Sequence, residues 1–187
     1  MIKQIILLFL VFFMLSCDSR NHIRIYYLPK NHTHNDSQQT KIIESQSSGF
    51  SWEKPDTWIP SQGSSMRIAS FDVPFSTGMG DLSVMELGGD GGGLVANVNR
   101  WRGQIGLEPL EKNEIMAQAQ RGENELGPYQ IFQLTNDSSS DGAILAAIIS
   151  MNNSTLYIKL TASNDGIKEL EMDFKNFCSS IKYDSKI

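Results

Sequence analysis

Cysteine and histidine are both scarce in this chain, and each scarcity excludes a class of site. The 187 residues include two cysteines, too few for a disulfide scaffold or a four-cysteine zinc site. The three histidines are His22, His32 and His34. A domain that begins near residue 49 therefore has no histidine base, which excludes Ser-His-Asp and Cys-His catalytic sets within it.

Basic charge is also in deficit. Sixteen Lys and Arg residues stand against 21 Asp and Glu, and the net charge of −5 disfavours a broad basic surface for nucleic acid. Carboxylate pairs such as Glu108 with Glu111 lie in polar segments, where a solvated face is the simpler interpretation than acid–base catalysis. With no metal cluster or cofactor motif in evidence, the sequence predicts a non-enzymatic protein without metal, cofactor or nucleic-acid partner.

A strongly apolar run near the start of the chain extends from Ile5 to Leu15 and is preceded by Lys3. The run is too short for a membrane-spanning helix, which needs about 20 residues, and it suits a secretory signal. Ser16 and Cys17 follow it, and this ending resembles a bacterial lipoprotein signal, in which the cysteine is lipidated. Met14 stands where that pattern prefers Leu. The alternative is an ordinary cleaved signal, or a retained anchor, with an incidental cysteine.

This interpretation divides the chain into three parts. Residues 1–16 are predicted to be a lipoprotein signal peptide, and 17–48 a lipidated N-terminus with a flexible polar tether. A flexible tether of about 30 residues has a typical end-to-end distance of roughly 30 Å. Residues 49–187 are predicted to form one globular domain outside the cytoplasm, anchored to the membrane of the cell envelope by its lipid.

Hydrophobic periodicity in the domain predicts strands and amphipathic helices. The predicted elements are a short strand from Phe50 with a turn at Pro55, strands over 65–73 and 82–87 joined by a loop over 72–81, helices over 94–105 and 108–121, strands over 129–135, 143–151 and 155–161, and a helix capped by Asn164. Short turns between consecutive strands predict an α+β fold with an antiparallel sheet flanked by helices.

Two helices are predicted to bury apolar stripes. In the first, the stripe is Leu94, Val98, Trp101 and Ile105; in the last, it is Ile167, Leu170, Phe174, Phe177 and Ile181. Cys178 adjoins the second stripe, so we favour a buried structural thiol over a reactive nucleophile.

The glycine-rich run from Gly88 to Gly93 leads into the first of these helices. Glycines allow close approach to a ligand, and a helix N-terminus offers free N–H groups to an anion. The run lacks the Gly-Lys-Ser/Thr ending of a nucleotide P-loop. Two interpretations remain open. One is a tight strand-to-helix connection in which Asp90 bonds local amides; the other is a small-anion or small-ligand site at Asp90, Gly91, Gly92 and Gly93.

The helix after the glycine run is dense in polar side chains. Asn97, Arg100 and Gln104 share one stripe, and Asn99 and Arg102 share another. Arginine suits contacts with carboxylate or phosphate, so this is where we place a candidate binding patch. The structural alternative is that one arginine pairs within the fold and the rest are solvated.

Several motifs resemble those of known proteins. Pro55-x-x-Trp58 near the start and Phe174-x-x-Phe177-x-Ser-Ser-Ile near the end are similar to the ends of PsbP-like domains. The stretches Met66-Arg-x-Ala-x-Phe, Gly89-Asp-x-Gly-Gly and Asn97-Val-Asn-Arg-Trp-Arg-x-Gln resemble a group of uncharacterised bacterial lipoproteins. The resemblance implies an α/β/α sandwich, and accessory proteins that bind other proteins rather than enzymes.

The lipoprotein interpretation predicts the effect of removing Cys17. The Cys17→Ala chain should accumulate as an unprocessed precursor and lose all labelling by a fatty-acid probe in the native host, because no thiol remains at the processing site. Labelling equal to that of the wild type would contradict the prediction.

Overall fold

A computed structural model describes residues 49–136, 138 and 142–184. All of these belong to a single unit that spans residues 42–187. The predicted signal peptide, Cys17 and the tether lie outside the described residues.

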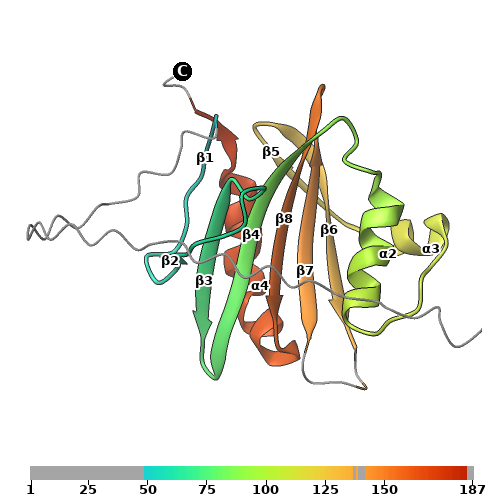
Figure 1. Cartoon of the computed structure of the whole chain (residues 1–187), viewed down its shortest axis with the longest axis horizontal. Coiled ribbons are helices and arrows are strands. Elements are labelled where there is room, and N and C mark those ends of the chain that lie inside the picture. Colours follow the sequence, from blue (N-terminus) through green and yellow to red (C-terminus); the bar gives the residue numbers. More distant parts are fainter. Residues whose placement is uncertain (1–48, 137, 139–141, 185–187) are drawn as a thin grey trace, which may run out of the picture. The chain divides into compact units, whose positions relative to one another are not determined.

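Seven strands form one antiparallel sheet in the order β2-β3-β4-β8-β7-β6-β5 (Figure 1). They are β2 (Ile59–Pro60), β3 (Ala69–Phe75), β4 (Gly78–Gly88), β5 (Gln120–Asn124), β6 (Gly127–Thr135), β7 (Ala143–Ser150) and β8 (Ser154–Ala162). A separate pair, β1 (Phe50–Ser51) and β9 (Lys182–Tyr183), brings the two ends of the domain together. The predicted α+β class and antiparallel sheet are confirmed.

Helices pack on both faces of this sheet. Helix α4 (Asn164–Ser180) lies on one face, and its predicted stripe is fully buried. Helices α2 (Leu94–Gln104) and α3 (Lys112–Gln118) lie on the other face, where Val98, Trp101 and Ile115 meet buried residues of β6, β7 and β8. Two separate hydrophobic clusters result, one on each side of the sheet. The three layers are helix, sheet and helix.

Strand β7 is the centre of the core. Every residue from Ala143 to Ile149 is buried, because β6 and β8 flank the strand and helices cover both of its faces. Alternate side chains enter the two clusters, as the pleat of a strand requires. A continuous apolar run of this kind is typical of a central strand, and the prediction over 143–151 is confirmed.

The loop predicted over 72–81 is wrong, because these residues extend β3 and β4 into a tight hairpin. Phe75 pairs with Gly78, and Pro74 with Met79. Pro74 is tolerated because β2 pairs only as far as Asp72, so the side of β3 that lacks an N–H faces no partner strand there. The strand also starts later than predicted, since a turn with a hydrogen bond from Arg67 N to Ser64 O precedes it.

The helix predicted over 108–121 is too long. Helix α3 is confined to Lys112–Gln118, and β5 follows directly as a sheet edge. Gly122 lies against the ring of Tyr129 on β6, where an added Cβ would meet ring atoms at 2.3 Å. A turn that includes Gly127, with φ 124°, joins β5 to β6 in a hairpin. Strand β5 lies at the edge of the sheet and pairs only with β6. Its residues are therefore polar, and the apolar alternation that predicts a strand is absent.

Two smaller expectations concern α4. Its N-cap is Ser163 rather than Asn164: the Ser163 backbone is extended, and its hydroxyl accepts from Gly166 N at 3.1 Å. An N-cap side chain must come from the residue just outside the helix. Cys178 is buried as predicted, and burial raises the pKa of its thiol well above the ordinary value.

Trp101 provides the test of the packing beneath α2. The side chain is 2% exposed and meets Tyr157 edge-on with ring centroids 6.1 Å apart. We expect Trp101→Ala to lower the free energy of unfolding by about 3–5 kcal/mol, through lost burial and the cavity left behind. Urea denaturation followed by far-ultraviolet circular dichroism measures the change. The exposed Met172 is the control, and Met172→Ala should stay within about 0.5 kcal/mol. Wild-type stability of Trp101→Ala would refute the assignment.

Candidate binding surface beside helix α2

The glycine turn before α2 is held by hydrogen bonds from inside the protein. Asp90 Oδ1 accepts from Gly92 N at 3.1 Å, so the carboxylate already occupies one of the turn's amides. Tyr157 Oη donates to the Asp90 carbonyl at 2.7 Å, and Thr155 Oγ1 donates to the Gly89 carbonyl at 2.8 Å. Two side chains of strand β8 thus hold the backbone of the turn.

Asn97 joins this turn to the helix. Its Nδ2 lies 3.0 Å and 2.8 Å from the carbonyl oxygens of Gly91 and Gly93, and 3.2 Å from Tyr157 Oη. The side chain is 2% exposed, and a buried amide is stable only when hydrogen-bonded in this way. Asn97 therefore faces the turn and not the solvent, although it belongs to the polar stripe of the helix.

Asn99 and Arg102 hold the connection that follows α2. Asn99 donates to the Leu110 carbonyl at 2.9 Å and accepts from Leu110 N at 2.9 Å, replacing the hydrogen bonds of a strand partner. Arg102 Nε donates to the Glu108 carbonyl at 2.8 Å. Both side chains thus have structural contacts on the side of α3. The sequence predicts one candidate patch made of two stripes; in the structure the contacts of Asn99 and Arg102 differ from those of Arg100 and Gln104.

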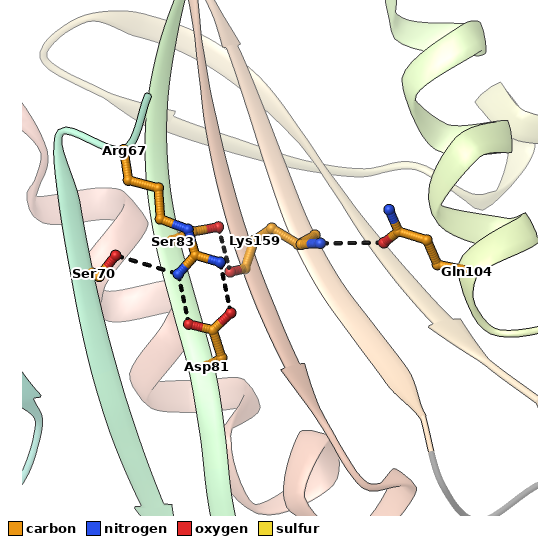
Figure 2. Close-up of polar contacts among 6 residues, drawn as sticks. All are labelled: Arg67, Ser70, Asp81, Ser83, Gln104 and Lys159. Carbon is orange, nitrogen blue, oxygen red and sulfur yellow. Dashed lines mark hydrogen bonds and ion pairs between the residues drawn. The ribbon is translucent and has the colours of Figure 1, made fainter. Parts of the chain in front are cut away.

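Gln104 points toward a part of the sheet that α2 and α3 leave uncovered. The buried cluster beneath these helices draws on β6, β7 and β8 and contains no buried residue of β3 or β4. In Figure 1 both helices stand on the β6 side, away from β3. We call the corresponding side of β3, β4 and β8 the open face. It carries Asp81 and Lys159, which keep solvent contact, and Ser70 and Ser83, which are buried (Figure 2).

Arg67 and Asp81 form the main ion pair of the open face. Arg67 Nη1 and Nη2 lie 2.7 Å and 2.8 Å from the two carboxylate oxygens of Asp81, and Nη1 also lies 3.2 Å from Ser70 Oγ. The hydrogen bond to Asp81 raises the pKa of Arg67 further. Because both partners retain solvent contact, the pair orders the surface more than it stabilises the fold.

Lys159 lies between this ion pair and α2. Its Nζ is 3.2 Å from Gln104 Oε1, and Ser83 Oγ lies 3.4 Å from the Lys159 carbonyl. Figure 2 shows the lysine extending along the sheet toward the helix. Burial lowers the pKa of Lys159; Asp81 opposes this shift, and Arg67 and Arg100 add to it. Arg100 is thus an electrostatic neighbour of Lys159, although the two are far apart in sequence.

Sequence reasoning named Arg100 and Gln104 for this surface and missed Arg67, Asp81 and Lys159. One signal was available, since the alternation of β8 places Lys159 opposite the core positions Leu156, Ile158 and Leu160. That alternation shows that Lys159 faces away from the hydrophobic cluster under α4. It does not show that the helical layer on the other face of the sheet, α2 and α3, ends beside Lys159.

A shallow cavity of about 250 Å³ lies elsewhere, beside the β5–β6 hairpin. Its lining is Met116, Ala119, Arg121, Pro128, Tyr129 and Gln130. Burial raises the pKa of Tyr129 to about 12. Within residues 49–136, 138 and 142–184, no three His, Cys, Asp or Glu side chains are grouped to hold a metal ion. None of the helices described is long and apolar enough to span a bilayer.

Comparison with known proteins yields structural likenesses only. No family model matches the sequence, and no curated protein matches it. The cyanobacterial PsbP protein CyanoP of Synechocystis sp. PCC 6803 is similar in structure, with a TM-score of 0.47, 14% identity, and coverage of 73% of this chain and 87% of that one. A protein of Bacteroides thetaiotaomicron VPI-5482 has a TM-score of 0.44 and 10% identity over 74% of this chain. This chain covers 46% of that protein's length.

The glycine turn generates a graded prediction. Gly91 has φ 58°, and an added Cβ would lie 2.6 Å from the Tyr157 ring. Gly93 has φ 83° and ψ 150°, a region open essentially to glycine alone, but its nearest neighbour would be 3.7 Å away. Gly93→Ala should lower the free energy of unfolding by about 1–3 kcal/mol, and Gly91→Ala should lower it more. Urea denaturation of single variants measures both. Wild-type midpoints in both would favour the anion-site interpretation.

Proposed function

We propose that the chain is a cell-envelope lipoprotein, anchored to the membrane through Cys17, whose globular domain binds a protein partner or assists an envelope complex. The leader supports the anchor: a short apolar run ends at Ser16-Cys17 and turns polar at Asp18. The tether predicted over residues 17–48 would keep the domain within reach of membrane proteins. The partner is thus a protein met at the membrane surface.

The observation that carries a binding role is the open face. Within the described part of the chain no helix covers it, yet its polar groups are held in place by a two-point ion pair and by hydrogen bonds. Met79, on the same side of β4 as Asp81, is 55% exposed. Methionine and arginine are both enriched at protein–protein interfaces, and this face carries Met79 and Arg67.

The chemistry of the face also favours binding over catalysis. Both carboxylate oxygens of Asp81 accept hydrogen bonds from Arg67, so the carboxylate is already occupied within the protein. Lys159 contacts the neutral amide of Gln104. These groups can recognise a surface by charge and hydrogen bonding without any covalent step.

The alternative was a small-anion site at the glycine turn. An external anion there would lie next to the Asp90 carboxylate, which accepts from Gly92 N. It would also face the carbonyls of Gly91 and Gly93 that Asn97 holds. The turn therefore offers an anion fewer free donors than its sequence suggested.

Photo-crosslinking in the native host tests the protein-binding role. A benzophenone amino acid placed at Met79 should form adducts with a partner, because the side chain is exposed on the open face. The same probe at Met172, which is 67% exposed on α4, is the matched control on the opposite side of the sheet. Adducts of defined mass from position 79 and not from 172 are expected. No adduct at 79, or identical adducts at both positions, would refute binding through the open face.

A further inference from the structure

Two cations at the border between α2 and the open face have no anionic partner among residues 49–136, 138 and 142–184. Lys159 Nζ contacts the amide oxygen of Gln104, and Arg100 Nη2 donates to the amide oxygen of Asn97. Neither takes part in the ion pairs of the described residues. A lysine has three N–H donors and an arginine five, so most of their donors are free to bind something else.

The nearby carboxylates form no ion pair with either cation, although Asp81 acts on Lys159 from a distance. Asp81 is engaged at both oxygens by Arg67. Asp72 pairs with Asp81 across the β3–β4 ladder, and β3 lies on the far side of β4 from β8. Asp90, on the turn before α2, accepts from Gly92 N. Lys159 and Arg100 therefore lack an ion pair of their own within the described residues. Neighbouring cations without an ion pair favour a ligand of the opposite sign.

Partial burial of Lys159 makes its lack of an anionic partner unfavourable. Much of Lys159 is removed from water, and this desolvation lowers its pKa. A carboxylate brought to Lys159 and Arg100 would form charge-assisted hydrogen bonds, which are about twice as strong as neutral ones. The free protein thus keeps two cations in place before the anion arrives, so little ordering is needed on binding.

We propose that Lys159 and Arg100, assisted by Gln104, bind a carboxylate of an acidic peptide segment in the partner protein. This inference rests on the proposed function of the open face. The surroundings suit a peptide: Met79 and Met85 lie on the same side of β4 as Asp81 and Ser83, and flexible apolar side chains accommodate peptide side chains of varied shape.

The test uses the full chain in neutral detergent, with hexaglutamate as the probe and isothermal titration calorimetry as the measurement. Hexaglutamate should bind, and added salt should weaken the binding. Lys159→Met and Arg100→Gln should each weaken it by about tenfold or more, the usual loss of a hydrogen bond to a charged group. Lys168→Met is the control, because Lys168 is on α4 and pairs with Asp165. This variant should bind hexaglutamate with the affinity of the wild type.

A further variant separates binding from folding. Gln104→Glu leaves both cations in place and puts a carboxylate of the chain itself beside Lys159 Nζ. It should weaken hexaglutamate binding by about tenfold as well, while thermal stability is kept or raised. Unchanged affinity in Gln104→Glu, as in Lys159→Met, would overturn the inference, as would the absence of any hexaglutamate binding. Displacement of hexaglutamate by inorganic phosphate at lower concentration than by acetate would overturn it in favour of a phosphate ligand.

The crosslinking experiment distinguishes this inference from the function on which it rests. Adducts from position 79 that persist undiminished in Lys159→Met and Gln104→Glu would reject the carboxylate site and leave the protein-binding role standing. Absent adducts in the wild type, together with hexaglutamate binding that depends on Lys159 and Arg100, would reject the protein partner and leave the carboxylate site. Loss of adducts in both variants supports the two together.

Discussion

The sheet is wider than the helices on one of its faces, and this mismatch determines where the domain has a surface to offer. Adjacent strands lie about 4.8 Å apart, whereas a helix with its side chains covers about 10–12 Å. Helices α2 and α3 therefore bury mainly the β6–β8 half of a seven-stranded sheet, and no buried residue of β3 or β4 belongs to the cluster beneath them. The face carries the Arg67–Asp81 pair and Lys159 together with the exposed Met79.

Helix α2 distributes neighbouring side chains among several tasks, because successive residues of a helix point about 100° apart. Trp101 enters the core, Asn97 holds the glycine turn, and Arg102 holds the next connection. Gln104 reaches the sheet at Lys159. Most of the polar side chains of α2 that the sequence groups into one binding patch thus hold the fold together. Arg100 and Gln104 remain as candidates for binding at the open face.

The glycine turn and the open face are physically connected. Tyr157 of β8 bonds the turn through its hydroxyl, and Asn97 bonds both the turn and Arg100. Lys159 follows Tyr157 two residues later on the same side of the strand, because side chains alternate. The turn therefore sets the position of Arg100 relative to Lys159. A structural role for the glycines and a binding role for the arginine are compatible, since the first supports the second.

Hydrophobic periodicity was enough to predict the α+β class, the buried stripes of α2 and α4 and the central strand β7, because it records which side of an element is apolar. It concealed β5 and the β3–β4 hairpin, where glycine, proline and polar residues suit an edge or a tight turn. The inward orientation of Asn97 and the contact of Lys159 with Gln104 follow from how the layers pack. Such contacts depend on where one layer ends over another, and no local pattern in the chain encodes that boundary.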